Sequence, residues 1–179
     1  MKYETIADVY SANEKIAERL RKTLSGVTEQ EAVALPDGEK WTIQQIAEHV
    51  AIVEHNIMKL CARLIETGKA AGKPSDGRVA IANDLAEKWA AAADTKLEAP
   101  DRVQPTGDVS VAESLERQIA NCDAFAALRS DFESFDLSEP KFPHPYFGDM
   151  TAVEWLVLTG GHEARHTAQI ERLLAKIRQ

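Results

Sequence analysis

The chain has 179 residues, of which 44% are hydrophobic and 28% charged, and these values fit one soluble globular domain over residues 1–179. Acidic residues outnumber basic ones by 29 to 21, and the net charge of -8 argues against a nucleic-acid partner. No segment has the roughly 18–20 consecutive apolar residues of a membrane span, and the N-terminus has no signal-peptide pattern. Together with two cysteines outside any C-x-x-C pair, these features predict a cytoplasmic protein with reduced thiols and no membrane partner.

Two long amphipathic patterns occupy the first part of the chain. Apolar residues at spacings of three and four predict a helix over residues 5–25, and a second such stripe predicts a helix from Trp41 to about Thr67. Residue pairs with the spacing of a capping box mark a short helical turn and the start of the second long helix, namely Thr28 with Glu31 and Thr42 with Gln45.

The middle of the chain, from Gly68 to Gly107, has weaker periodicity. We expect residues 69–78 to form a loose connection, residues 79–93 to form an Ala-rich helix, and the Pro-containing stretch up to Gly107 to be extended. A crossover of this length allows the next helix to run in the same direction as the previous one.

Two further helical patterns complete the chain. Capping-box spacing marks their starts, with Ser110 and Glu113 for one and Thr151 and Glu154 for the other. The third long helix is expected to bury a set of apolar residues, namely Val111, Leu115, Ile119, Cys122, Phe125 and Phe132. The segment 142–148, rich in prolines and aromatic residues, is expected to form a compact loop over an end of the helices. No stretch indicates a strand, so the predicted fold class is all-α.

A histidine pair stands in the last helical pattern. His162 and His166 are four residues apart, which places them one turn apart on one face, the geometry in which two imidazoles bind one metal ion. Both share the stripe of Ile170, so each needs a polar partner in an apolar layer. We therefore favour a metal site over two hydrogen-bonded core histidines. Gly160 and Gly161 before the pair indicate a space that is kept open, or else a local kink without function.

The pair also belongs to the string H-E-x-x-H of zinc peptidases, in which the Glu acts as general base. Such an enzyme needs a third ligand, and no suitable residue stands at the expected distances after His166, so a third ligand has to come from upstream. Glu163 lies about 100° from His162 around the helix. We expect Glu163 to be a surface carboxylate or an outer partner of a ligand, with a role as catalytic base as the alternative.

The chain has three other histidines. His49 lies near the edge of the apolar stripe of the second long helix, where ligation of a metal and a hydrogen bond to a carbonyl are equally good interpretations. His55 points nearly opposite to that stripe and is expected to be solvated. His144 stands between two prolines, and we expect no functional role for it.

Three motifs taken together resemble those of the DinB-like family: W-T-I-x-x-I-x-x-H at residues 41–49, H-P-x-F-G-x-x-T at residues 144–151, and H-x-x-x-H-x-x-Q at residues 162–169. The Pro-x-Gly element at residues 105–107 also matches, so the resemblance covers nearly the whole chain. The resemblance implies a four-helix bundle with a long crossover between helices two and three. It also implies a homodimer, and a divalent metal ion held by His49, His162 and His166.

Three imidazole ligands leave coordination positions open for water or substrate, which is typical of catalytic sites. Zinc is the default metal for three nitrogen ligands, with nickel, iron and manganese as alternatives. The resemblance implies a metal-dependent enzyme that acts on small molecules, either as an S-transferase that uses a low-molecular-weight thiol or as a hydrolase. A non-catalytic metal- or ligand-binding bundle protein and a zinc peptidase are the alternatives. Arg165 and Gln169 are further candidates for residues near the ligands.

Overall fold

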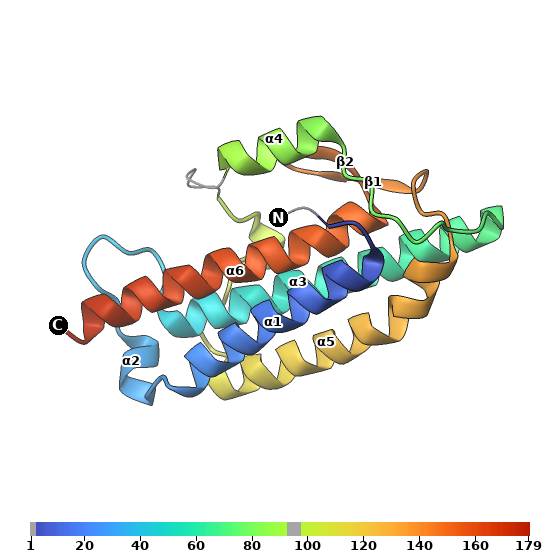
Figure 1. The fold of residues 1–179 in the computed structure, drawn as a ribbon. Helices are drawn as coiled ribbons and strands as arrows, with labels where there is room; N and C mark the ends of the chain where they lie inside the picture. The colour runs from blue at the N-terminus through green and yellow to red at the C-terminus, as the bar shows by residue number, and fades with distance from the viewer. Residues whose placement is uncertain (1–2, 93–97) are drawn as a thin grey trace.

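The computed structural model describes residues 3–92 and 98–179. Four long helices form its main body, namely α1 (Ile6–Ser25), α3 (Ile43–Ala71), α5 (Val111–Ser134) and α6 (Ala152–Ile177). Helices α1 and α6 run in one direction and α3 and α5 in the other, so the crossover joins two parallel helices, as expected (Figure 1). Helix α3 packs against α5 and α6, and α1 packs against the same two helices. The predicted four-helix bundle is confirmed. None of the described helices is long and apolar enough to span a bilayer.

Capping boxes define where the helices begin. At each long helix, a Ser or Thr hydroxyl accepts a hydrogen bond from the backbone N–H three residues later, and the side chain at that position accepts one from the cap residue. A fifth box starts the short helix α2 (Glu29–Val33). The boxes expected from the sequence are all present, at Thr28, Thr42, Ser110 and Thr151.

The crossover between α3 and α5 contains one helix, α4 (Asn83–Ala92), and one turn of 3-10 helix, η1 (Asp101–Val103). Its loose part begins later than predicted, because α3 continues to Ala71. The helix ends at Gly72, whose φ of 67° is the left-handed conformation common at helix ends. The predicted Ala-rich helix is present but starts later than expected, and residue 93, its predicted end, lies outside the described residues.

A β-hairpin precedes α6, so the expectation of a loop without strands is wrong. Strand β1 (Lys141–His144) pairs antiparallel with β2 (Gly148–Thr151). Each strand has only four residues and the first contains a proline, so the sequence shows too little alternation for a strand to be recognised. The hairpin does pack over the bundle as predicted, since the indole N–H of Trp155 donates to the carbonyl of Phe142 at 3.3 Å.

Two hydrophobic clusters fill the bundle, one toward the hairpin and one toward the other end. On α3, Ile57 belongs to the first and Val50 to the second, with the buried Glu54 between them. On α6, the buried Glu163 likewise lies between Val157 and Ile170. A buried polar layer therefore separates the clusters, and its described members are Glu54, Gln118, Asn121 and Glu163.

The polar layer also changes which face of α5 is buried. Ile119, which the sequence predicts to be buried, is 47% exposed, whereas its neighbour Gln118 is 2% exposed. Helix α5 turns its polar stripe inward at this level because the carboxyl groups in the layer need hydrogen-bond partners. Further along, Phe125 and Phe132 are buried as predicted.

The two glycines of α6 serve different purposes. A Cβ atom on Gly160 would lie 2.1 Å from Oδ1 of Asn13, so glycine lets α1 approach α6 closely at this point. The Asn13 amide in turn donates to the carbonyl of Leu156 at 3.0 Å. A Cβ atom on Gly161 would meet nothing within 4 Å, and Gly161 lines a cavity. The open space expected from the sequence therefore lies at Gly161.

Candidate metal centre

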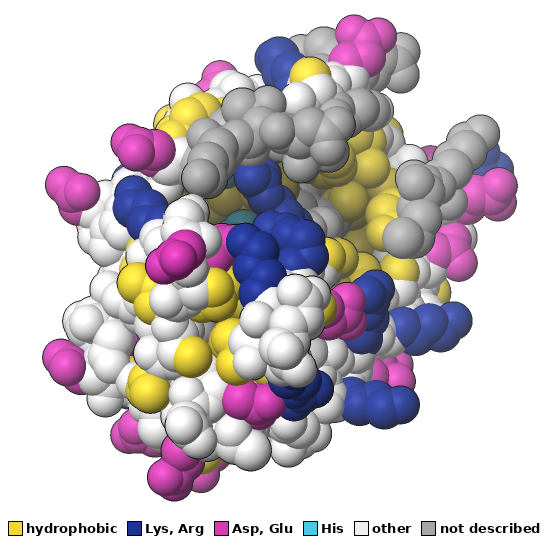
Figure 2. Space-filling view, turned by 90° about the vertical axis from the view of Figure 1, so that its left-hand side faces the viewer, with side chains coloured by type: hydrophobic (Ala, Val, Ile, Leu, Met, Phe, Trp, Pro, Cys, Tyr) yellow, Lys and Arg dark blue, Asp and Glu magenta, His cyan; other side chains and the backbone are white. Residues whose placement is uncertain are grey.

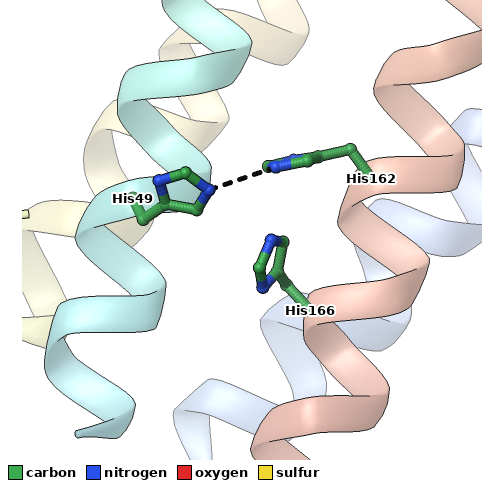
Figure 3. Close-up of side chains that lie close together, drawn as sticks. All are labelled: His49, His162 and His166. Carbon is green, nitrogen blue, oxygen red and sulfur yellow. Dashed lines mark hydrogen bonds between the residues drawn. The ribbon is translucent and has the colours of Figure 1, made fainter. Parts of the chain in front are cut away.

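Three histidines from two helices converge at one point in the bundle (Figure 3). His49 comes from α3, and His162 and His166 come from successive turns of α6. One ring nitrogen of each lies within 4.8 Å of the other two. The Nε2 atoms of His49 and His162 are 3.2 Å apart, as the dashed line in Figure 3 marks. The structure thus brings together the three residues that the resemblance implied as ligands, although two of them are more than a hundred residues from the third.

Hydrogen bonds fix which nitrogen of two of these rings is available. The Nδ1 atom of His49 lies 2.8 Å from the carbonyl oxygen of Val103, and a carbonyl only accepts, so Nδ1 carries the proton. The Nδ1 atom of His166 likewise donates to Oε1 of Gln169 at 2.9 Å. Each ring therefore keeps its lone pair on Nε2. Outer partners of this kind orient the histidines of metal sites, and Gln169 was expected near the ligands.

The arrangement fits a divalent metal ion. Four-coordinate zinc binds imidazole nitrogens at about 2.0–2.1 Å, which sets neighbouring ligand nitrogens about 3.3 Å apart. The observed separation of 3.2 Å between His49 and His162 agrees with this value. Without a bound ion, the Nε2 atoms of His49 and His162 would face each other at 3.2 Å with at most one proton between them. Three nitrogen donors suit zinc and also nickel, iron and manganese.

Burial keeps the three imidazoles neutral. It is the main reason why the pKa of His49 is lowered, that of His162 is well below the ordinary value, and that of His166 falls to about 3. The positive charges that the neighbouring histidines and Arg165 would carry lower the pKa values of His162 and His166 further. Neutral imidazoles are the form that binds metal ions, so the site is ready for a ligand role at pH 7.

The crossover is tied to α3 next to His49. The carboxylate of Glu48, which is 3% exposed, accepts hydrogen bonds from the backbone N–H of Thr106 at 3.0 Å, its hydroxyl at 2.8 Å, and the N–H of Gly107 at 2.8 Å. These bonds hold the segment that carries Val103, the partner of His49. The Pro-x-Gly element is recognisable in the sequence, whereas Glu48 was not predicted, although its position beside His49 on an apolar helix is a signal for such a role.

We expect Glu48→Ala to lower metal affinity by about ten-fold, because loss of an outer partner of a ligand typically costs about 10- to 100-fold. The substitution releases the crossover and with it the carbonyl that orients His49. Competition with a chromophoric chelator measures the affinity. Glu66→Ala, at an exposed position of the same helix, is the matched control and should leave the affinity unchanged. An unchanged affinity in folded Glu48→Ala would show that the crossover holds its place without this carboxylate.

The histidines lie in a cavity of about 2330 Å³ between α3, α6, the crossover and the hairpin. Figure 2 shows it as a hollow with a histidine visible inside. Its described lining includes aromatic residues from several elements, namely Trp41, Trp89, Phe142, Phe147 and Trp155. The site is therefore open to molecules from outside the bundle.

The two remaining histidines lie apart from this cluster. His144 lines the same cavity and stacks on Phe147, with ring centroids 4.5 Å apart, and burial lowers its pKa to about 4. His55 is exposed, as predicted, and its Nδ1 atom lies 3.2 Å from Oδ1 of Asn121.

Glu163 is buried, which corrects the expectation of a surface carboxylate. It is 2% exposed, and Gln118 donates to its Oε1 atom at 3.0 Å. Its carboxyl group also interacts with that of Glu54, and burial raises the pKa of Glu163 to about 7. Glu163 is absent from the described lining of the cavity. A role as catalytic base stays a prediction.

We expect Glu163→Gln to retain the wild-type metal affinity, because the carboxyl group faces α3 and α5 and not the shared point of the three histidines. Equilibrium dialysis of variant and wild type measures this. Loss of the metal in a folded variant would place Glu163 among the ligands, whereas a large loss of turnover with the metal retained would support a role as general base.

A four-helix bundle with a long crossover and three convergent histidines defines a class of small helical proteins with a cluster that could hold a metal ion. The chain belongs to the DinB superfamily, which it matches over residues 12–170, and the resemblance drawn from the motifs is confirmed. It is 22% identical over 160 residues to "Uncharacterized protein YuaE" of Bacillus subtilis (strain 168), a match that covers 86% of this chain and 90% of the relative.

Among solved structures, the fold is similar to that described as "Crystal structure of TT2238, a four-helix bundle protein". The TM-score is 0.58 at 20% sequence identity, and the match covers 94% of this chain and 99% of the other. This likeness shows the shared bundle fold and carries no information on activity.

Proposed function

We propose that this protein is a divalent-metal-dependent enzyme that acts on small molecules and transfers a low-molecular-weight thiol to an electrophilic substrate. The observation that supports this proposal is the convergence of three neutral imidazoles inside an open cavity. Structural zinc sites use four protein ligands, whereas three leave a position for water or substrate. Membership of the DinB superfamily is compatible with such a site.

The size of the cavity is compatible with a transfer reaction. Small-molecule sites usually enclose about 300–1,000 Å³. The cavity here measures about 2330 Å³, which is enough for two small molecules beside each other. A transfer reaction needs this space for its two substrates, whereas hydrolysis needs one substrate and a water molecule. Hydrolysis is the second candidate, because the same site would also suit a metal-bound water.

The thiol has to come from outside the chain. Cys61 is fully buried, and burial raises its pKa above the ordinary range. Burial and the nearby carboxyl groups of Glu54 and Glu163 raise the pKa of Cys122 to about 12, so this thiol is protonated at pH 7. Neither cysteine is part of the described cavity lining. A bound metal ion would supply the acidity that deprotonates an incoming thiol.

The residues of the chain then have defined tasks. His49, His162 and His166 would hold the metal ion, and the Val103 carbonyl and Gln169 keep two of the rings in the required orientation. The aromatic lining would exclude water and bind the apolar parts of the substrates.

The test begins with metal analysis of protein purified without a histidine tag. The metal-loaded protein is then assayed with low-molecular-weight thiols and a chromogenic electrophile, with His49→Ala as the control. We expect product formation that requires both the metal and the thiol. Product without added thiol would indicate a hydrolase, and cleavage of casein would indicate a peptidase. A protein that holds its metal and turns over none of these substrates would be a binding protein, the non-catalytic alternative.

A further inference from the structure

The hairpin holds one histidine in a fixed position at the edge of the cavity. His144 comes from β1 and lines the cavity, although no functional role was expected for it from the sequence. Its ring stacks on that of Phe147, with centroids 4.5 Å apart and an angle of 16° between the planes. The ring of Trp155 lies 5.2 Å away on the bundle side. These two aromatic neighbours restrict rotation of the imidazole.

A backbone hydrogen bond sets the tautomer of His144. The N–H of Tyr146 donates to the Nδ1 atom of His144 at 3.1 Å, so Nδ1 carries the lone pair. Burial, and after it the charge of Arg102, lowers the pKa of His144 to about 4, so the ring is neutral at pH 7. A neutral imidazole with its lone pair on Nδ1 carries its proton on Nε2. His144 therefore offers a neutral N–H donor in a fixed orientation.

This donor is available to a molecule in the cavity. The Nε2 atom of His144 has no hydrogen-bond partner among the described residues, and it stands at the tip of the side chain, away from the hairpin backbone that binds Nδ1. The residue is half-buried and lines the cavity, so the tip is the part that reaches the open space. A positive charge on His144 would lower the pKa of His162, which places the ring within electrostatic range of the candidate metal centre.

An exposed aromatic ring lies beside this donor. Tyr146 lines the cavity and is 46% exposed, and its ring centroid is 6.0 Å from that of His144. The Tyr146 hydroxyl donates to the carbonyl of Glu98 at 2.7 Å, so the ring is held in place although its face is open. Trp89 contacts the ring of Phe147 with centroids 6.3 Å apart and extends the aromatic wall. We call the group of His144, Tyr146, Phe147 and Trp89 the hairpin subsite.

We propose that the hairpin subsite binds a flat, uncharged ring that carries a carbonyl oxygen, with Nε2–H of His144 as the donor to that oxygen. Aromatic side chains with one placed polar group are typical of sites for such molecules, and the open face of Tyr146 suits a flat ring. A carbonyl accepts a hydrogen bond without a charge, so it matches a neutral donor, whereas carboxylates are bound best by charged donors. The assignment rests on the proposed function for the reaction and names the chemical class of the substrate that would accept the thiol.

The experiment measures binding to metal-free protein, so that the probe cannot bind a metal ion instead. The probes are acetophenone and α-methylstyrene, which have nearly the same shape but differ in that a methylene group replaces the carbonyl oxygen. All three tryptophans of the chain line the cavity, so tryptophan fluorescence reports on probes bound there. We expect both probes to bind, since both present a flat ring to the aromatic wall.

Variants separate the donor from the ring. His144→Phe keeps an aromatic ring against Phe147 and removes the donor. It should lower the affinity for acetophenone about five-fold, as for the loss of one neutral hydrogen bond, and leave the affinity for α-methylstyrene unchanged. Tyr146→Leu should lower both affinities alike, by about three-fold. His55→Phe is the matched control at an exposed position of α3 outside the described lining, and thermal melts verify that each variant is folded.

Nitrogen NMR of the wild-type protein tests the donor without any substitution. In protein labelled with nitrogen-15, the resonances of the His144 ring show which nitrogen carries the proton. We expect the proton on Nε2 at pH 7, and we expect the Nε2 resonance to shift when acetophenone is added but to stay nearly constant with α-methylstyrene.

Three results would overturn the inference: a proton on Nδ1 of His144, no binding of acetophenone, or an equal effect of His144→Phe on both probes. These results are distinct from a failure of the proposed function. Acetophenone binding that depends on His144, in a protein that turns over no electrophile, would contradict the proposed enzyme and support the subsite. Thiol transfer to carbonyl electrophiles with the same KM in His144→Phe and wild type would support the enzyme and contradict the subsite.

Discussion

His49→Ala is expected to lower the metal affinity of the protein by at least about 100-fold, because loss of a mere outer partner of a ligand already costs about 10- to 100-fold. In the candidate site, His49 comes from α3 and the other two histidines come from α6. Without it, the ion keeps two protein bonds from a single helix. The pair on α6 alone then resembles any two histidines one turn apart on a helix surface.

The controls for this result are His55→Ala and His144→Ala. His55 lies on the same helix but is exposed, and His144 lines the same cavity without joining the cluster. Both variants should keep the wild-type affinity in a chelator competition assay. Thermal melts of the apo forms should show that His49→Ala is folded, since both hydrophobic clusters remain. Equal metal affinity for His49→Ala and wild type would remove the three-histidine site and the proposed function together.

The helices were predictable because their signals are local. A capping box requires only a hydroxyl residue and a side-chain acceptor three positions later, so Thr42, Ser110 and Thr151 mark helix starts without knowledge of the rest of the chain. The hairpin before α6 gives no such signal. Its strands are short, and they are stabilised by contacts with the bundle such as the bond from Trp155 to Phe142.

The histidine cluster was predictable only in part from helix geometry. Spacing alone places His162 and His166 together, but it left His49 with two interpretations, and the resemblance decided between them. The tertiary structure then showed what spacing cannot, namely that the crossover brings the carbonyl of Val103 to His49 and that Glu48 holds the crossover there.

The buried polar layer was missed although the sequence contains a signal for it. Glu54 lies four residues after Val50 and three before Ile57, so it is in phase with the apolar stripe of α3. Glu163 lies seven residues before the buried Ile170 and is therefore nearly in phase with it. Helix α6 is buried on two faces, so its buried residues do not form a single stripe. The angle between Glu163 and His162 therefore predicted a side chain that faces solvent, whereas Glu163 faces α5.

The buried carboxyl pair has a consequence for stability. Glu54 is 2% exposed, and its Oε2 atom forms no hydrogen bond with the described residues. Burial raises the pKa of Glu54 well above its ordinary value, and the neighbouring Glu163 raises it further, while burial raises the pKa of Glu163 to about 7. Gln118 connects Glu163 to Arg21, whose guanidinium lies 3.2 Å from the Gln118 amide oxygen and only partly compensates for the carboxyl groups.

Because the pKa values of Glu54 and Glu163 are raised in the folded state, these two groups stabilise the fold more in acid than in base. Above about pH 4.5, the unfolded chain releases protons that the folded pair retains. The pair therefore makes its full stabilising contribution to the free energy of unfolding below about pH 4.5. The contribution is lost as the pH rises through 7 and beyond, where the folded protein has to ionise two adjacent buried groups.

Glu54→Gln is expected to remove this pH dependence in part, because the amide keeps the size of the side chain and carries no charge at any pH. The variant should be as stable as wild type near pH 4.5 and more stable at pH 8 by roughly 1–3 kcal/mol, the typical desolvation cost of a buried group without a hydrogen-bond partner. Urea unfolding at both pH values measures the difference, with Glu66→Gln at an exposed position of α3 as the control that should change nothing. A variant that differs from wild type by the same amount at both pH values would show that Glu54 matters through its packing, since only an ionising group makes the effect depend on pH.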